Sequence, residues 1–420
     1  MVGWPSGLRQ QFAKLRGSKA PHRFESCTHR PVYIIKAYTL NDFHRIVVMH
    51  MLSGVGMGLV GIFIPIYLLE LTYSFSAVVS WLLMHHLSLL CGAFLVIYIS
   101  NAIGLVRCWY IRVVLVALLF SGLSLLPSYP ALLYALAFIS GMEAAFFWIP
   151  FNILTVRKTE ASTMGSSLAF MSNMGSAVGI AIPGIAALII VHYGYLLLFI
   201  IAFLFILVSI IPVLPLKGET THFQFSTPVV SQIIRVNRKF ILPEILDNLG
   251  QDAQVIWTLF IFITALTVLD IGILGVLIGI IGMVITHSTG TLIDRWNRKT
   301  VMRFGAVGTT ILWVISYVIA VYSPTPIMLY ITTALRGFVL GIFAAAYGTT
   351  MFNRARSADA QFLVLREVPT IFGRVVLFGI TLALLSVGQL ELVFLVVAVL
   401  SLYFWFNDFD SLIKLSRAEF

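Results

Sequence analysis

The sequence predicts an all-α polytopic membrane protein whose 12 transmembrane helices form two pseudo-symmetric six-helix bundles. Composition is the first reason, because 60% of the 420 residues are hydrophobic and only 10% are charged. Soluble chains carry about 25% charged residues, because they must present a polar surface to water. The composition therefore excludes a soluble enzyme and a nucleic-acid-binding module, in spite of a net charge of +10.

Hydropathy patterning is the second reason, because long apolar runs alternate with short polar breaks from residue 44 onward. A helix needs about 20 apolar residues to cross the hydrocarbon core, whereas the strands of membrane barrels are only about ten residues long. The runs predict helical spans at 44–70, 76–99, 107–126, 130–155, 165–191, 194–215, 243–268, 271–290, 300–322, 326–351, 365–387 and 390–408.

These spans define the expected domain organisation. The connection 216–242 is the longest, and it separates an N-terminal bundle (44–215) from a C-terminal bundle (243–408) that precedes a cytoplasmic tail (409–420). Within this connection, Val229–Phe240 mixes apolar and basic residues, which fits either an amphipathic helix on the inner leaflet or a basic linker.

Residues 1–31 differ from the rest of the chain, because they are polar and basic and lack the apolar run of a secretory signal. Arg23-Phe24-Glu25-Ser26 can be encoded by codons that resemble the T-arm of a tRNA gene. We therefore expect a non-native or disordered extension, with the true start near Val32 or beyond.

Lysine and arginine residues mark every second connection between the predicted spans. Leaving residues 1–31 and the two mid-span arginines 336 and 374 aside, they occur before the first span, at the even-numbered connections and in the tail, at positions 36, 45, 107, 112, 157, 158, 217, 235, 238, 239, 295, 298, 299, 303, 354, 356, 366, 414 and 417. The other connections contain neither residue type. Under the positive-inside rule this alternation places both termini in the cytoplasm.

The two halves of the sequence also resemble each other at an offset of 196 residues. The matching positions are Gly54 and Gly250, Pro130 and Pro326, Gly141 and Gly337, and Phe147 and Phe343. Internal repeats of this kind are common in secondary transporters, so the pattern favours a duplicated six-helix unit.

The connection between spans 8 and 9 carries a recognisable motif, which consists of Gly290, Asp294, Arg295, Arg298 and Lys299. This motif resembles the G-x-x-x-D-R-x-x-R-[KR] loop of the major facilitator superfamily. The resemblance implies a cytoplasmic gating loop in which the acid and the bases latch neighbouring helices. The corresponding connection between spans 2 and 3 (100–107) contains no acidic residue, so the first copy of the latch is degenerate.

Span 5 contains a second pattern, Gly175-x-x-x-Gly179-x-x-x-Pro183-Gly184. It partly resembles the glycine-proline motif of the drug/proton antiporters of this superfamily, which slightly favours export. Close packing of two helices through small residues explains the same pattern equally well in physical terms.

Charged residues in the middle of a span are functional candidates, because each costs about 2.5–3.5 kcal/mol even on lenient insertion scales. The candidates for substrate binding or coupling are Glu143, Arg336, Arg374, Asp252 and His85. The resemblance implies that spans 1, 4, 7 and 10 line a central cavity, that spans 2, 5, 8 and 11 flank it, and that the others face lipid. We expect the interiors of spans 3, 6, 9 and 12 to contain no buried charge.

Glu143 and the two arginines allow two interpretations. A carboxylate removed from water binds a proton more readily, so Glu143 is a candidate proton carrier, but it is equally a candidate fixed partner of Arg336 or Arg374. The arginines stay charged, so each must meet a carboxylate, backbone carbonyls or an anionic part of a substrate. Arg374 also fits an inner gate with Arg366 and Glu367.

The remaining candidates lie on spans 7 and 2. Asp252 fits a proton or cation site, or a polar gate that is wetted from the cytoplasm. His85 and His86 are adjacent, so at most one of them faces a cavity, and the other possibility is a hydrogen bond within the bundle. The aromatic residues Phe147, Trp148, Trp257 and Tyr347 fit a pocket for an organic solute or simple packing.

These features predict a secondary active transporter that moves a small organic solute by alternating access, with protons as the coupling ion. The sequence contains no G-x-x-x-x-G-K-[ST] loop, so we expect energy from an ion gradient and no cofactor, metal or nucleic-acid partner. We expect a monomer in the plasma (inner) membrane of a prokaryote. The alternatives are a non-transporting sensor or lipid-handling relative, and a membrane-embedded transferase, for which the outward connections are too short to hold a catalytic site.

Overall fold

The computed structural model describes residues 41–159, 164–216, 219–220, 227–264, 266–295, 298–322, 325–357 and 360–407. All of these lie in one compact unit, which comprises Leu40–Phe420. The predicted extension 1–31 and the tail 409–420 lie outside the described residues.

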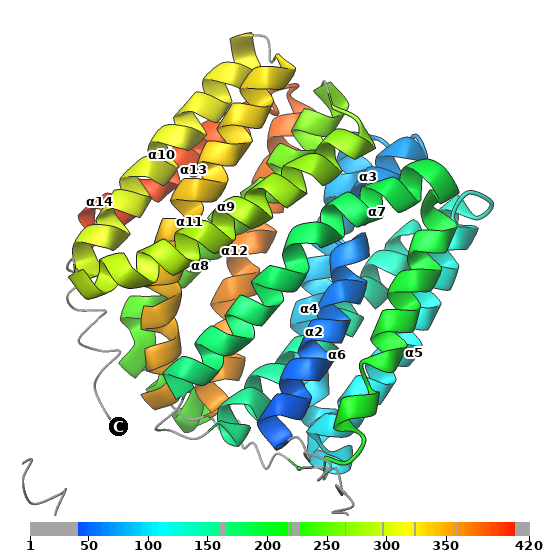
Figure 1. Cartoon of the computed structure of the whole chain (residues 1–420), viewed down its shortest axis with the longest axis vertical. Coiled ribbons are helices and arrows are strands. Elements are labelled where there is room, and N and C mark those ends of the chain that lie inside the picture. Colours follow the sequence, from blue (N-terminus) through cyan, green and yellow to red (C-terminus); the bar gives the residue numbers. More distant parts are fainter. Residues whose placement is uncertain are drawn as a thin grey trace, which may run out of the picture. The chain divides into compact units, whose positions relative to one another are not determined.

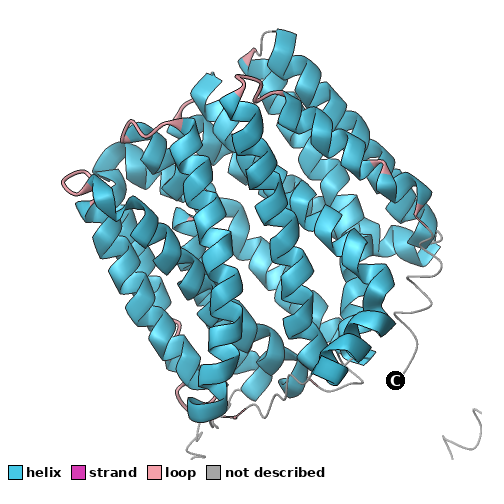
Figure 2. Cartoon of the chain, turned by 180° about the vertical axis from the view of Figure 1, so that it is seen from behind, coloured by secondary structure: helices cyan, strands magenta, loops and turns pink. Residues whose placement is uncertain are grey.

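The described chain consists of helices joined by short connections, and it contains no strand (Figure 2). In chain order the helices are α2 (Asp42–Val60), α3 (Phe63–Glu70), α4 (Phe75–Ile103), α5 (Leu105–Leu125), η1 (Pro130–Leu132), α6 (Leu133–Lys158), α7 (Met164–Val208), η2 (Ile211–Val213), α8 (Thr227–Thr264), α9 (Val268–Arg295), α10 (Arg298–Tyr322), α11 (Pro326–Ser357), α12 (Ala360–Ser386), α13 (Leu392–Ser401) and α14 (Tyr403–Phe406) (Figure 1). The prediction of an all-helical protein is confirmed.

Local chemistry explains where several of these helices begin and end. The side chains of Asn41 and Ser74 cap α2 and α4 by accepting hydrogen bonds from backbone N–H groups of the first turn. Gly104 separates α4 from α5 with φ +88°, a conformation that residues with a Cβ rarely adopt. Gly194 has φ +78° and divides α7 where spans 5 and 6 are predicted to meet.

Nine helices in the described residues are long and apolar enough to cross a membrane. One of them, Ile180–Val213, includes the break at Gly194, and the segment Leu392–Phe406 is a shorter apolar helix. Helix α8 is not among the nine, and it begins at Thr227. The predicted connection 216–242 therefore includes a helical part, and this part is continuous with the predicted seventh span.

We use "N-terminal half" for α2–α7 and "C-terminal half" for α8–α14. Within the N-terminal half, α4 packs on α6 and α2 packs on α7, while in the C-terminal half α8 packs on α12 and α10 packs on α11. Two pairs of helices make the largest contacts between the halves, namely α4 with α12 and α7 with α9, and smaller contacts join α6 with α12 and α3 with α8. Segments that are far apart in the sequence thus form two main contacts between the halves.

The contact between α7 and α9 is made by small residues. A methyl group placed on Gly272 or Gly275 of α9 would overlap Ala187 or Pro183 of α7, so the two backbones approach closely. Small residues permit this approach in membrane helices, where dispersion contacts replace the hydrophobic effect as the driving force. The Pro183-Gly184 pattern is therefore used for helix packing, as one of its two interpretations predicted.

Helix α12 approaches α8 equally closely at Gly373. A methyl group there would overlap the carbonyl oxygen of Ile245, whose backbone cannot move aside without displacing α8. Gly379 lies on the same helix, but nothing surrounds its Cβ direction within 4 Å. The two glycines therefore form a matched pair, of which only Gly373 is required by packing.

We expect Gly373→Ala to lower the free energy of unfolding by about 1–3 kcal/mol, which is the usual cost of overpacking a close contact. Thermal unfolding of the purified protein in detergent measures this effect, and Gly379→Ala is the control that should unfold at the wild-type temperature. Equal stability of the two variants would contradict the close approach of α12 to α8.

Candidate functional site

A ladder of polar side chains joins α8 and α12. The residues of α8 are Glu244, Asn248 and Asp252, and those of α12 are Arg366, Thr370 and Arg374. Within each helix they are spaced four residues apart, so they share one face. We call these six residues the polar ladder.

The lower part of the polar ladder is paired at one of the two carboxyl oxygens of Glu244, whereas the other, Oε2, is buried without a hydrogen bond to a described residue. Glu244 Oε1 accepts hydrogen bonds from Arg366 Nε at 2.8 Å and from Thr370 Oγ1 at 3.1 Å, and it lies 2.7 Å from Arg366 Nη2. Asn248 Nδ2 donates to the Glu244 carbonyl oxygen at 2.9 Å. Glu244 is 2% exposed, so this charge is stabilised by Arg366 and not by water.

The upper part of the ladder reaches a helix of the other half. Asp252 Oδ1 lies 3.7 Å from Arg374 Nε, and Asp252 Oδ2 lies 3.1 Å from Nε2 of His86 on α4. Arg374 also donates from Nη2 to Asn248 Oδ1 at 3.1 Å. His86, Asp252 and Arg374, which we call the boundary cluster, therefore join α4 of the N-terminal half to α8 and α12 of the C-terminal half.

The boundary cluster is held by charge more than by well-directed hydrogen bonds. Asp252 Oδ2 and Arg374 Nε are buried, yet neither makes a hydrogen bond with any described residue. Buried polar atoms are normally paired, so unsatisfied atoms at a specific place call for an explanation. A site that exchanges partners or protons during function provides one.

The structure corrects the choice between the two histidines. His85 was the candidate, but its Nδ1 lies 2.9 Å from Ser140 Oγ on α6, within the N-terminal half. His86, one residue further on, faces Asp252 instead. The sequence showed that the two rings diverge, but it did not show how α4 is rotated.

The structure also corrects the expected partners of Glu143. Glu143 Oε2 lies 3.0 Å from Arg112 Nε, and both side chains are 2% exposed. Arg112 further donates from Nη1 to Ser53 Oγ at 2.7 Å and lies over the ring of Phe147. Glu143 thus pairs with Arg112 of α5, and not with Arg336 or Arg374.

Arg112 also contradicts the expectation that span 3 contains no buried charge. It lies two turns after the start of α5 at Leu105. Because it is near this helix end, the sequence placed it among the basic residues of the cytoplasmic connection between spans 2 and 3. In the structure its side chain points into the N-terminal half. The pair with Glu143 satisfies both charges, which favours the fixed-partner interpretation of Glu143.

Arg336 is buried in the C-terminal half without an ion pair among the described residues. Its guanidinium lies 3.5 Å from the ring centroid of Trp313 on α10 and 4.9 Å from that of Trp257 on α8. Its one described hydrogen bond, to Ser316 Oγ, is long at 3.5 Å. Nε and Nη2 have no described partner, so Arg336 keeps donors that an anionic group is able to satisfy.

The four predicted pocket aromatics do not come together. Phe147 and Trp148 surround His50, Trp257 lies beside Arg336, and Tyr347 stacks on Phe343 in a third cluster. None of them lines either of the two pockets described here.

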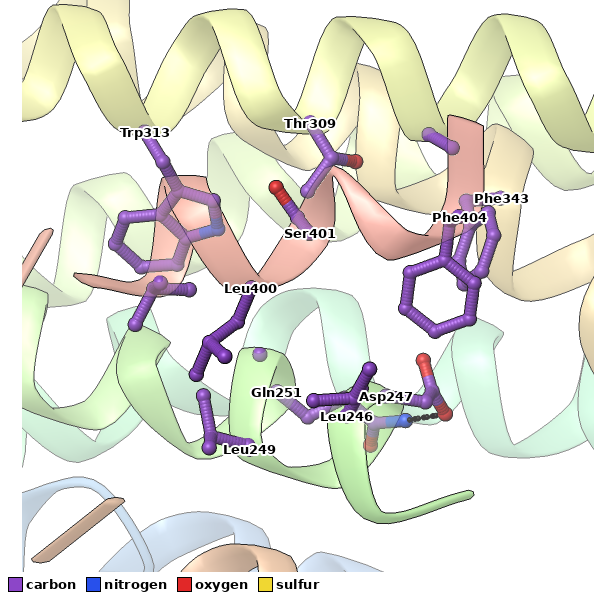
Figure 3. A pocket seen from close by; sticks show the side chains of 13 residues that line it. Leu246, Asp247, Leu249, Gln251, Thr309, Trp313, Phe343, Leu400, Ser401 and Phe404 are labelled. Atoms are coloured by element: carbon purple, nitrogen blue, oxygen red, sulfur yellow. Dashed lines mark hydrogen bonds between the residues drawn. The ribbon is translucent and has the colours of Figure 1, made fainter. Parts of the chain in front are cut away.

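Figure 3 shows the smaller pocket, which lies between α8, α10, α11, α13 and α14 and is lined by Asp247, Gln251 and Trp313 among others. Its volume is about 30 Å³, which suffices for a water molecule and not for an organic solute.

The predicted gating loop is only partly described. The side chains of Gly290, Asp294, Arg295 and Arg298 lie outside the described residues, and Lys299 lies in the first turn of α10. On the N-terminal half, Lys158 at the end of α6 pairs with Asp42 and Glu219, and the backbone N–H of Leu105 donates to the Glu219 carbonyl oxygen at 2.9 Å. The acidic residue beside the degenerate connection 100–107 is therefore Glu219, which follows span 6 in the sequence.

Fold and site together define a polytopic helical membrane protein with a charged cluster at the contact between two halves. The sequence profile described as Major Facilitator Superfamily matches residues 46–355. The chain belongs to the major facilitator superfamily, and the predicted resemblance is confirmed. It is a multi-pass membrane transporter of this type.

Solved structures of transporters share the fold at low sequence identity. A D-xylose-proton symporter is 14% identical with a TM-score of 0.65, and the match covers 87% of this chain and 96% of that one. The nucleoside transporter NupG is 14% identical with a TM-score of 0.59, covering 89% and 100% of the two chains. The E. coli fucose:proton symporter FucP is 13% identical with a TM-score of 0.62, covering 90% and 98%. No curated protein matches the chain.

The buried pair of Arg112 and Glu143 generates a prediction about stability. Glu143→Leu leaves Arg112 charged and buried, so we expect the free energy of unfolding to fall by about 3–5 kcal/mol. The double variant Arg112→Met/Glu143→Leu removes both charges and should regain most of this loss. Unfolding in detergent, followed by circular dichroism, measures the wild type, both single variants (Glu143→Leu and Arg112→Met) and the double variant.

An exposed ion pair provides the control for this experiment. Arg157→Gln alters a contact with Glu219 in which both side chains are about one third exposed, and it should cost less than about 1 kcal/mol. If the losses in the single variants of Arg112 and Glu143 simply add in the double variant, the two residues do not act as a structural pair.

Proposed function

We propose that the protein is a secondary active transporter that moves a small organic solute by alternating access and couples this movement to protons at the boundary cluster. The observation that carries the proposal is the contact of Asp252 on α8 with His86 on α4, at 3.1 Å across the boundary between the halves. Alternating access changes such contacts between halves and leaves contacts within each half intact.

Proton coupling follows from the chemistry of this contact. Asp252 contacts His86 at 3.1 Å and lies 3.7 Å from Arg374; the carboxylate and the imidazole are both groups that exchange protons, whereas the arginine stays charged. When the halves move apart, His86 leaves with α4, so Asp252 loses the partner with which it is able to share a proton. Proton binding and movement of the halves are then linked through differential contacts.

In this proposal Glu143 has a structural role and does not carry the coupled proton. Its partner Arg112 belongs to the same half, so the contact persists when the halves move. Two similar structures are named as proton symporters of sugars, and a third is named as a nucleoside transporter, which supports a small organic solute as cargo.

Arg336 is our candidate for binding an anionic group of the solute. Two of its nitrogen atoms have no partner among the described residues, and the face of Trp313 fixes the plane of its guanidinium. A planar arginine of this kind suits a carboxylate or a phosphate, whose oxygens accept two parallel hydrogen bonds.

The proposal includes 12 crossings with both termini in the cytoplasm of a prokaryote, in the plasma (inner) membrane, and a monomeric protein. The break at Gly194, the continuity of α8 and the apolar helix Leu392–Phe406 support the additional crossings beyond the nine long helices. The loop with Gly290 and Asp294 remains the proposed gate, and the packing role of Pro183 removes the main support for export.

Asp252→Asn tests the coupling, because asparagine keeps the shape of the side chain but cannot bind or release the proton. We expect solute-driven proton movement into liposomes to fall by about tenfold or more, with solute binding retained. The control is Asp247→Asn on the same helix, which faces the small pocket within the C-terminal half. A pH-sensitive dye inside the liposomes reports the flux.

Proton movement that survives in Asp252→Asn would contradict coupling at the boundary cluster. If Glu143→Gln abolished it in protein of wild-type stability, the coupling site would be Glu143. A folded protein that moves no solute from a broad panel would favour the non-transporting alternative.

Arg336→Met tests the proposed solute contact. An unpaired buried charge contributes little to stability, so the melting temperature should stay at or above that of the wild type, whereas uptake of an anionic solute should fall by about tenfold. Arg336→Lys keeps the charge but loses the planar contact with Trp313, and it should recover only part of the uptake. Wild-type uptake in the Met variant would exclude Arg336 from the solute site.

A further inference from the structure

An apolar groove of about 530 Å³ lies between α4, α8 and α12. Sites that hold small organic ligands have volumes of about 300–1,000 Å³. Its mouth is formed by Phe94 of α4, Ile234 of α8 and Phe372 of α12, which are 51%, 47% and 53% exposed. Large apolar side chains at such an opening are suited to contact with lipid and not with water.

The interior of the groove carries one ion pair. Glu244 and Arg366 both line it, and their contact at 2.7 Å cancels the two charges. The other lining residues are apolar except Asn237. The groove thus presents little net charge to an occupant, which suits a hydrocarbon chain.

Basic residues lie beside the groove on α8. Ile234, Asn237 and Ile241 are spaced three and four residues apart and form the lining face of the helix. Arg238 follows Asn237, which places it about 100° round the helix on the flank of this face, whereas Arg235, one turn before it, lies further round the helix, toward the side of Lys239. Both arginines are exposed, and the stretch from Val230 to Pro243 contains no acidic residue.

The expected depths of the groove residues in the membrane fit an apolar groove with a basic edge at the cytoplasmic surface. The predicted orientation places the start of α8 and α12 and the end of α4 on the cytoplasmic side. Phe94 and Phe372 then lie deeper than Arg235 and Arg238, so the apolar end of the groove points toward the bilayer core. Cytoplasmic leaflets carry anionic lipids that attract basic residues at their surface.

From this arrangement we propose that the groove binds one acyl chain of an anionic phospholipid of the inner leaflet, with Arg238 holding the phosphate. Because Phe94 belongs to the N-terminal half and Phe372 to the C-terminal half, a bound chain contacts both. Its affinity therefore differs between conformations, and the lipid composition sets the balance between them.

Lipid binding to the detergent-purified full chain tests this site independently of transport. Native mass spectrometry compares phosphatidylglycerol with phosphatidylcholine of identical acyl chains. We expect tighter binding of phosphatidylglycerol, weakened about fivefold by Arg238→Gln. The matched control is Lys239→Gln, which removes the same charge from the opposite side of α8 and should leave the binding unchanged.

A second pair of variants tests the groove itself. Val368→Trp fills it from α12 and should reduce binding of both lipids, whereas Val399→Trp adds the same side chain at an exposed position of α13 and should not. Melting temperatures identify any misfolded variant, in which case the comparison of Arg238→Gln with Lys239→Gln decides alone.

Three results would overturn the proposal. Equal binding of the two lipids would indicate an uncharged occupant, and equal effects of Arg238→Gln and Lys239→Gln would indicate non-specific attraction to the surface. Unchanged binding in folded Val368→Trp would place the lipid outside the groove.

Discussion

The lack of water in the hydrocarbon core is the constraint on which the rest of this structure depends. Every polar side chain placed there needs a partner on a neighbouring helix, because an unsatisfied group costs several kcal/mol. The polar ladder between α8 and α12 meets part of this requirement, because Arg366 and Thr370 donate to Glu244 and Arg374 donates to Asn248. It also fixes the relative position of the two helices along their axes, since a shift by one turn would separate Glu244 from Arg366. The close approach at Gly373 brings the backbones near enough for these contacts.

Three charged groups of the described core differ in how completely each charge is paired. Arg112 and Glu143 satisfy each other inside one half, and Ser53 accepts a further hydrogen bond, so nothing in their surroundings changes when the halves move. The boundary cluster joins both halves and leaves Asp252 Oδ2 without a hydrogen bond among the described residues. Arg336 has aromatic neighbours and no described carboxylate. Stability alone explains the first group, whereas the other two make sense if partners arrive or leave during a transport cycle.

The sequence predicted the helices because length and hydropathy are local properties, and it identified the family because the gating motif is a contiguous segment. It could not predict the ion pairs, because these join residues that are far apart in the chain, such as Glu244 and Arg366. Arg112 was misplaced because sequence position measures distance along α5, whereas burial depends on how the helix is rotated. The rotation of α4 likewise decides which of His85 and His86 faces Asp252, and the sequence does not show this rotation. One signal of the polar ladder is present in the sequence, because its polar residues are four positions apart on both helices and therefore share one face of each. They are Glu244, Asn248 and Asp252 on α8, and Arg366, Thr370 and Arg374 on α12.

The two largest contacts between the halves differ in the interactions that stabilise them. The described contact of α7 with α9 consists of small residues around Pro183 and Gly272, and dispersion forces weaken as soon as such surfaces separate by a fraction of an ångström. The contact of α4 with α12 lies beside the ionic groups of the boundary cluster, in which Asp252 of α8 faces both His86 of α4 and Arg374 of α12; the attraction between such groups extends further, and their partners are exchangeable. A rocking motion that preserves the first contact as its pivot therefore changes mainly the second. On this argument the boundary cluster and the apolar groove, which lie along the same side of the molecule on α4, α8 and α12, respond to the same movement, and a proton at Asp252 and a lipid beside Phe372 bias one equilibrium.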